Sequence, residues 1–293
     1  MNKTRLQIAK PDILRYFNER PSRVFLPSDI ARILTQQRDS WRLAQSTNIP
    51  RFVQFLADAG KLTKIVFPFP PPYKRAVRYT WGEVSLYQVL LTLRRGCYLS
   101  HYTSVKLHGL TEQLPKTFYL NVEQKSSGFS QGELTQRAID NAFKNNPRVS
   151  GNVAETEDFR VCIIGGKNTG KLGVIEEKVL PEAGTLRFTN LERTLIDIAV
   201  RPNYAGGVFE VRKAYELARE KLSVNRLAAM LQKLAYTYPY HQAIGYYLEH
   251  AGCKPELLDL LRQAPMEFDF YLTHKMGEMD YVKDWRLFVP KGF

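Results

Sequence analysis

The stretch NIPRFVQFLADAGKLTKIVF, residues 48–67, decides the fold of the first part of this 293-residue chain. Asn48 is a typical helix N-cap, and Gly60 stands where a helix ends. Between them, apolar residues recur at the spacing of one helical face: Ile49, Phe52, Val53 and Leu56. We therefore expect a helix with one buried stripe, followed directly by a strand over residues 62–67.

The flanking segments extend this pattern on both sides. Residues 11–20 and a segment from Ser28 predict two earlier helices, and residues 76–81 predict a second strand after the proline-rich loop PFPPPYKR, residues 68–75. Three helices followed by a two-stranded hairpin is the order of a winged helix-turn-helix, whose third helix enters the major groove of DNA. We predict that residues 1–82 form such a domain.

Positive charge is concentrated in the same segment. The whole chain carries +13, and residues 1–82 alone carry 15 Lys and Arg against 5 Asp and Glu, a net charge of +10. Residues 83–293 carry only +3. A charge concentrated in this way attracts polyanions, so double-stranded DNA is the expected partner.

Six residues of this segment are candidates for DNA contact. On the third helix, Arg51 has the chemistry to pair with guanine, and Gln54 and Asn48 have the chemistry to pair with adenine. Lys74, Arg75 and Arg78 on the hairpin are expected to contact phosphate or the adjacent minor groove. Two other interpretations stay open: an exposed basic face without a function, with Asn48 only a cap, or a winged helix that binds protein.

The stretch VCIIGGKNTGKLG, residues 161–173, resembles a phosphate-binding loop but departs from it. Leu172 stands where that motif needs Ser or Thr for magnesium, and the residues that follow favour a strand over a helix. We predict a β-hairpin over residues 159–180 instead. A magnesium nuclease built from Glu176, Lys178 and Asp158 is a weaker alternative, because an alternating charged strand is usually a solvated face.

Other enzymatic or metal chemistry finds no support in the sequence. Cys97, Cys162 and Cys253 form no C-x-x-C pair and have no histidine at zinc spacing. His101 and His108 bracket a short expected helix without a third ligand nearby. We expect no catalytic residues, no metal and no cofactor. The chain opens without a leader, and it has no apolar run that would span a membrane, so we expect a cytoplasmic protein with reduced thiols.

The second part of the chain, residues 83–293, predicts a larger α+β domain that is helical from about 206 to 265. Two motifs are prominent in it. YLSHYTSVKLHGL, residues 98–110, predicts a helix capped by Ser100. TNLERTLIDIAVRPNYAGGVFEVRKAYELA, residues 189–218, predicts two helices that meet at Gly206-Gly207, the first capped by Thr189 with Glu192 and anchored by Arg193 and Asp197.

These two motifs, with the closing DWRLFVPKGF, resemble the AbiEi-type antitoxins of bacterial abortive-infection, type IV toxin–antitoxin systems. The resemblance spans most of residues 83–293, and E-R-T-L-x-D is its most recognisable element. It implies a mixed α/β (α+β) protein of two domains. The long proline loop over residues 68–75 departs from that family.

The resemblance also implies a function and a set of partners. The winged helix would repress its own operon at inverted repeats in the promoter, and the second domain would counter a nucleotidyltransferase toxin. Five motif positions carry over without an assigned role: Ser100, His101, Glu192, Arg193 and Asp197. A DNA-binding regulator without a toxin partner is the alternative.

Overall fold

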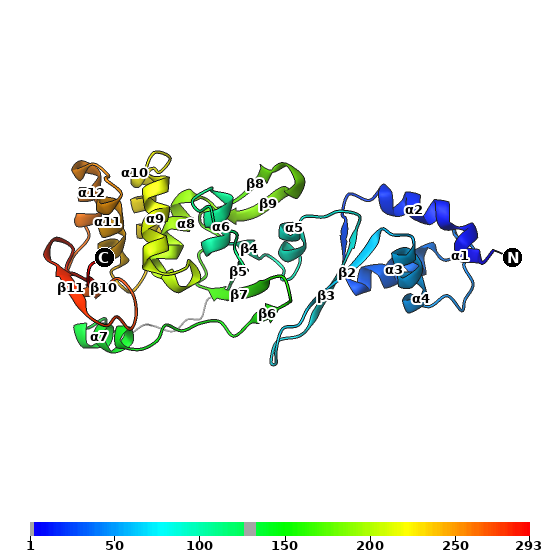
Figure 1. The fold of residues 1–293 in the computed structure, drawn as a ribbon, viewed down its shortest axis with the longest axis horizontal. Coiled ribbons are helices and arrows are strands. Elements are labelled where there is room, and N and C mark those ends of the chain that lie inside the picture. Colours follow the sequence, from blue (N-terminus) through cyan, green and yellow to red (C-terminus); the bar gives the residue numbers. More distant parts are fainter. Residues whose placement is uncertain (1–2, 126–132) are drawn as a thin grey trace. The chain divides into compact units, whose positions relative to one another are not determined.

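The computed structural model describes residues 3–125 and 133–293, which form two compact units (Figure 1). The first unit comprises the chain up to Arg95 together with residues 154–157 and 178–186. The second comprises residues 96–153, 158–177 and 187–293. The sequence predicted a boundary at residue 82; the first unit continues beyond it because it includes α5 (Leu86–Leu91).

The first unit contains five helices and a small antiparallel sheet within its described residues. The order along the chain is α1 (Arg5–Ile8), α2 (Lys10–Asn18), β1 (Val24–Phe25), α3 (Pro27–Gln37), α4 (Ile49–Asp58), β2 (Leu62–Phe67), β3 (Ala76–Trp81) and α5. The strands are ordered β1-β3-β2, with Leu62 opposite Trp81 and Phe67 opposite Ala76. The helix and strands expected over residues 48–67 and 76–81 are therefore present, but Ile49, expected in the buried stripe, is 43% exposed at the start of α4.

An aromatic core holds this unit together. Phe17 stacks on Trp81 with ring centroids 4.8 Å apart, and Phe52 of α4 is fully buried in the same cluster. The Trp81 indole N–H donates to Asn18 Oδ1 at 2.9 Å, which satisfies the only polar atom of that buried side chain. The apolar stripe of α4 thus fixes which face of the helix is exposed.

The second unit contains most of a six-stranded mixed sheet, ordered β6-β7-β5-β4-β9-β8. Its strands are β4 (Tyr98–Leu99), β5 (Thr117–Glu123), β6 (Val153–Glu155), β7 (Arg160–Gly166), β8 (Val174–Leu180) and β9 (Gly184–Thr189). β5 and β7 are parallel, in register from Thr117 opposite Arg160 to Glu123 opposite Gly166. The helices α6 (His101–Leu107) and α7 (Gln136–Lys144) lie in the connections.

The predicted hairpin over residues 159–180 is wrong, because β7 and β8 are not neighbours. β7 pairs with β5, whereas β8 lies next to β9 at the far edge. The glycine-rich segment between them is a connection held by Glu123, whose carboxylate accepts from the backbone N–H of Lys171 at 3.0 Å and from the Thr169 hydroxyl. Parallel pairing leaves no local signal that distinguishes this connection from a turn.

The chain from Leu191 to Arg262 is mostly helical; the sequence predicted helix from about 206 to 265. It contains α8 (Leu191–Val200), α9 (Val208–Ala218), α10 (Val224–Leu234), α11 (Tyr240–His250) and α12 (Pro255–Arg262), with a short 3-10 turn at Pro202–Tyr204. Two further 3-10 turns lie at Pro181–Ala183, before β9, and at Lys283–Trp285. A further sheet that the sequence did not predict closes the chain, ordered β10-β12-β11: β10 (Phe270–Tyr271), β11 (Met279–Val282) and β12 (Leu287–Pro290).

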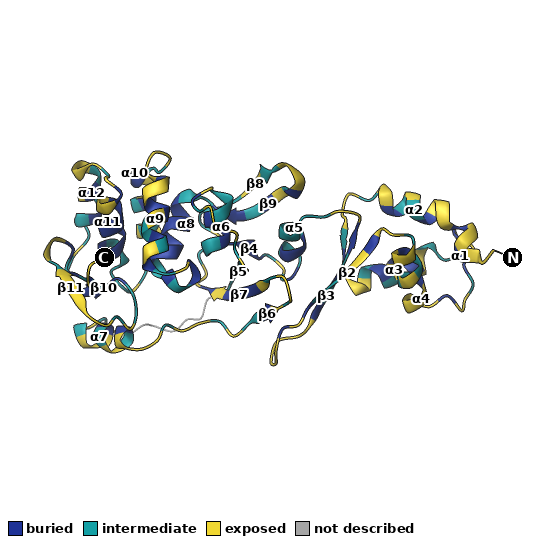
Figure 2. Ribbon diagram, in the orientation of Figure 1, coloured by how far each residue is buried: buried dark blue, intermediate teal, exposed yellow. Residues whose placement is uncertain are grey.

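Helix α8 lies at the centre of the second unit, and its residues from Glu192 to Ala199 are all buried (Figure 2). It contacts α6, α9, α10 and α11. Its N-cap is Asn190, whose Oδ1 accepts from the backbone N–H of Arg193 at 2.9 Å. The expected Thr189–Glu192 capping box does not form, because the Thr189 hydroxyl bonds to Thr194 instead.

The architecture is a mixed α+β fold, as the sequence predicted. In the described residues, no helix combines the length and the apolar character needed to cross a bilayer.

Candidate functional site

The amino-terminal end of α4 is exposed and carries the predicted base-reading residues. Arg51 and Gln54 both lie on the solvent face, and Gln54 Nε2 donates to Asp58 Oδ1 at 2.7 Å, which orients its amide. Asn48 Oδ1 accepts from the backbone N–H of Arg51 at 3.0 Å. A bidentate contact to adenine needs the oxygen that this bond uses, so Asn48 serves here as the helix cap.

The hairpin presents two of its three predicted basic residues. Lys74 and Arg75 are exposed in the loop between β2 and β3, and Lys64 on β2, which the sequence reasoning missed, is exposed as well. Arg78 is only 6% exposed, and its guanidinium donates to the Thr92 hydroxyl at 2.8 Å and to the Thr92 carbonyl at 2.7 Å. It points inward because alternate residues of β3 share the buried face. The prediction that Arg78 contacts DNA is therefore corrected.

Within the second unit, a small polar pocket of about 50 Å³ gathers most of the motif residues. Five segments contribute to it: the start of α6, strand β5, the end of β7, one face of α8, and the segment between α10 and α11. We call it the polar pocket, and its lining residues are His101, Asn121, Gly166, Lys167, Arg193, Asp197, Val200, Arg201 and Tyr236.

A buried ion pair forms one wall of the polar pocket. Arg193 Nε donates to Asp197 Oδ1 at 2.7 Å, and the two side chains are 5% and 7% exposed. Arg193 Nη1 donates further to the Leu172 carbonyl at 2.6 Å and to the Thr169 hydroxyl at 3.2 Å. Burial raises the pKa of Asp197, and the attraction of Arg193 and Arg201 limits that rise. The four-residue spacing predicted that the two side chains lie on the same side of the helix; the structure shows in addition that Arg193 ties the segment after β7 to α8.

His101 forms a second wall and is held in an unusual conformation. It is 4% exposed, its φ is +51°, and its Nδ1 lies 2.9 Å from the Ser100 hydroxyl oxygen. Burial lowers the pKa of His101 well below its ordinary value, and the positive charges of Arg201 and Arg193 add to this effect. The imidazole is therefore neutral. A buried non-glycine residue in this backbone region is often found at a functional site.

Two further cations face the pocket, and the sequence reasoning identified neither. Lys167 Nζ donates to the carbonyls of Leu234 at 2.9 Å and Ala235 at 2.7 Å, so two of its three N–H groups are used. Arg201 is half-buried, and its guanidinium makes no hydrogen bond or ion pair with the part of the chain that the structure describes.

The remaining wall depends on a close approach between two strands. Asn121 Nδ2 donates to the Tyr98 hydroxyl at 2.6 Å. Its Oδ1 lies so near Gly166 that a Cβ at that position would be 2.4 Å away. Gly166 thus leaves the space that the Asn121 amide occupies at the pocket wall, and a larger residue there would displace the amide.

Glu192, the fifth motif position, lies outside the polar pocket. Its carboxylate accepts from Arg226 Nη2 at 2.9 Å and from the backbone N–H of Ser223 at 3.4 Å. It ties α8 to the start of α10 and has a structural role.

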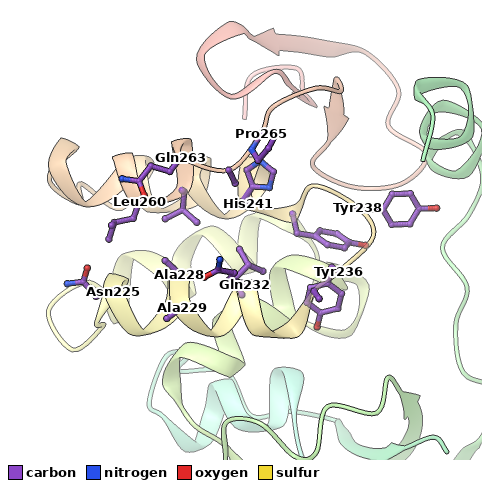
Figure 3. A pocket seen from close by; sticks show the side chains of 15 residues that line it. Asn225, Ala228, Ala229, Gln232, Tyr236, Tyr238, His241, Leu260, Gln263 and Pro265 are labelled. Carbon is purple, nitrogen blue, oxygen red and sulfur yellow. The ribbon is translucent and has the colours of Figure 1, made fainter. Parts of the chain in front are cut away.

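A larger groove of about 680 Å³ lies between α10, α11 and α12 (Figure 3). Small residues line its base, among them Ala228 and Ala229, and the His241 Nε2 atom is buried in its wall without a hydrogen-bond partner among the described residues. Tyr236 lines both this groove and the polar pocket, and Figure 3 shows its hydroxyl pointing away from His241.

The residues of the nuclease alternative do not come together. Asp158 precedes β7, whereas Glu176 lies on β8 and its Oε1 accepts from Arg187 Nε at 2.7 Å. Three strands separate β7 from β8, a distance of about 19 Å at roughly 4.8 Å per strand. No group of three or more His, Cys, Asp or Glu side chains placed to hold a metal occurs among the described residues.

Comparison with protein-family models and with curated proteins finds no match for this chain. Among solved structures, the chain is similar to the RV2827C protein from Mycobacterium tuberculosis, with a TM-score of 0.63 and 16% sequence identity. The similarity covers 98% of this chain and 93% of the other. At this identity the likeness concerns the fold, and it extends over both units.

Proposed function

We propose that this chain is a DNA-binding transcriptional repressor that acts on its own promoter. The observation that carries the proposal is the exposed start of α4, with Arg51 and Gln54 on its solvent face, in a segment of net charge +10. The order of helices and strands in this unit matches that of a winged helix-turn-helix, in which this helix would lie in the major groove.

The loop between β2 and β3 supports the same proposal. It presents Lys74 and Arg75 to solvent, and a wing of this kind grips phosphate beside the recognition helix. Such a protein works where promoter DNA is found, so we place it in the cytoplasm. Inverted repeats are the operator that the family resemblance implies.

The test is binding of the full chain to its own upstream DNA and to unrelated duplex at several salt concentrations. Arg51→Ala should weaken binding to the promoter by about 1–3 kcal/mol more than binding to unrelated DNA, because one base contact is lost. Lys74→Ala should weaken both alike and lower the log–log salt slope by roughly 0.9.

Arg15→Ala is the matched control. Arg15 is an exposed arginine on α2 with 65% of its side chain exposed, and Figure 1 draws α2 and α4 at opposite edges of this unit. Its removal should change the promoter preference little. Equal losses from Arg51→Ala and Lys74→Ala on both DNAs would contradict the assignment of α4 as the reading helix.

We further propose that the chain is an antitoxin that counters a nucleotidyltransferase toxin. Support comes from the resemblance of residues 98–110 and 189–218, four of whose motif positions lie together at or beside the polar pocket. Co-expression with the nucleotidyltransferase of the same operon should restore growth, and Arg51→Ala should retain this protection. Failure to protect would leave the alternative, a regulator without a toxin partner.

A further inference from the structure

We propose that the polar pocket of the second unit binds a small oxyanion of the phosphate class. No part of this inference depends on DNA binding or on a toxin, because every lining residue lies within the second unit. The argument starts from charge. Lys167, Arg193 and Arg201 face the pocket against one carboxylate, Asp197, which leaves two positive charges unbalanced.

One other carboxylate, that of Glu123, acts electrostatically on Asp197 and offsets part of this excess from outside the pocket. Glu123 lies outside the lining, and its carboxylate accepts from the Lys171 backbone N–H and the Thr169 hydroxyl. Lys167 is exposed and Arg201 is half-buried, so water screens part of the repulsion among the cations, and a bound counter-charge would relieve the rest. An anion bearing two negative charges supplies that counter-charge.

The donors converge from several directions, as a tetrahedral anion requires. Lys167 has one N–H group left after its bonds to Leu234 and Ala235, and Arg193 has its Nη2 left after its bonds to Asp197, Thr169 and Leu172. The Arg201 guanidinium forms no bond with the described chain.

The neutral His101 and the Tyr236 hydroxyl add donors that carry no charge. Burial raises the pKa of Tyr236, so this hydroxyl stays protonated. A planar carboxylate has two oxygens and would leave several of these groups unpaired, whereas phosphate has four.

The size of the pocket agrees with this assignment. A cavity needs roughly 10–15 Å³ to admit one water-sized group, so about 50 Å³ admits about four. That is one phosphate group without a large substituent. A larger substituent on the phosphate would have to lie outside the pocket, and the groove between α10, α11 and α12, which Tyr236 also lines, has room for it.

The decisive variant is Arg201→Gln, because its effect separates a ligand-binding role from a structural one. Arg201 holds no partner in the described chain, so its replacement should leave the melting temperature unchanged or raise it in phosphate-free buffer. Sodium phosphate should raise the melting temperature of the original chain by several degrees above a sodium chloride control of equal ionic strength. Arg201→Gln should lose most of that increase.

Titration calorimetry with inorganic phosphate should show at least a tenfold weaker affinity for Arg201→Gln and for Lys167→Met. The matched controls are Arg219→Gln, directly after α9, and Lys213→Met, within α9; both cations are exposed and pair with Glu220 and Glu210. Both controls should bind as the original chain does. Lys167 also donates to two backbone carbonyls, so its loss could disturb the fold. The phosphate affinity of Lys167→Met is therefore compared with that of the original chain only after circular dichroism shows that the variant is folded.

Ribose 5-phosphate and guanosine 5′-monophosphate distinguish the sources of the phosphate group. Equal affinities for inorganic phosphate and for these two esters would support a site for free phosphate. If one ester binds more tightly than phosphate and Arg201→Gln removes that binding, the ligand is a phosphorylated metabolite. The proposal is overturned if phosphate stabilises the original chain no more than chloride does. It is overturned equally if Arg201→Gln and Lys167→Met bind phosphate as tightly as the controls.

Discussion

Replacing Asp197 by alanine should cost the protein a large part of its stability. Asp197 and Arg193 are joined at 2.7 Å, and both side chains are more than nine-tenths buried. Without the carboxylate, the guanidinium stays buried beside Arg201 with no counter-charge. Breaking a buried pair in this way costs about 3–5 kcal/mol. We expect the lower end, about 3 kcal/mol, because Arg193 keeps its bonds to Leu172 and Thr169.

The measurement is urea unfolding of the full chain followed by circular dichroism, with hydrogen exchange of the α8 peptides to locate the loss in the second unit. For a unit of this size, 3 kcal/mol corresponds to a fall in melting temperature of roughly 6–12 °C. Asp197→Asn keeps an oxygen that accepts from Arg193 Nε, so it should lose less than Asp197→Ala.

Asp259→Ala is the matched control, because Asp259 pairs with Arg262 at 3.2 Å but is 63% exposed. Solvent screens that pair, so its loss should cost less than about 1 kcal/mol. If Asp197→Ala and Asp259→Ala lost the same stability, or if α8 kept its protection from exchange, the view of this pair as a desolvated anchor would be refuted.

Three further predictions follow from single contacts. Gly245→Ala should destabilise the chain, because the new Cβ would lie 2.1 Å from Trp285 Cζ3 and overpacking costs about 1–3 kcal/mol. This cost should exceed the gain of about 1 kcal/mol that alanine brings within a helix. Chemical denaturation measures the change in stability, and near-ultraviolet circular dichroism reports the change around Trp285. Burial lowers the pKa of His101, so below its ordinary value of 6.5 the unfolded chain binds a proton that the folded chain does not. The free energy of unfolding should therefore fall as pH drops through 6.5, by at most about 1.4 kcal/mol per pH unit for this residue, and His101→Gln should flatten that slope in unfolding titrations. Arg78→Ala should reduce stability because the Thr92 carbonyl and hydroxyl lose the bonds that they accept from the guanidinium. It should leave the salt slope of DNA binding unchanged in filter-binding or anisotropy titrations.

The first unit was predictable because its elements follow from local pattern. The apolar stripe of α4 places Phe52 and Leu56 inward and leaves Arg51 outside, and the Asn48 cap and the Gly60 end agree with it. Arg78 shows the limit of this reasoning. A positive charge suggested exposure, but the alternation of β3 puts residue 78 on the same buried face as Ala76 and Thr80. In a strand, whether a residue occupies an odd or an even position decides which face of the sheet its side chain lies on, whatever its residue type.

The polar pocket was only partly predictable, for a reason that lies in topology. Arg193 and Asp197 share one helical face and were found by spacing alone, whereas Lys167 and Asn121 reach them through the parallel pairing of β5 with β7. Parallel strands are joined by long connections, so their partners are distant in sequence and leave no local pattern. A hairpin over residues 159–180 would have placed Lys167 in a solvated turn; the parallel sheet instead places it against the end of α10 and beside α8. The excess of positive charge in the pocket therefore arises from the sheet order, and it becomes visible only when five separate segments are brought together.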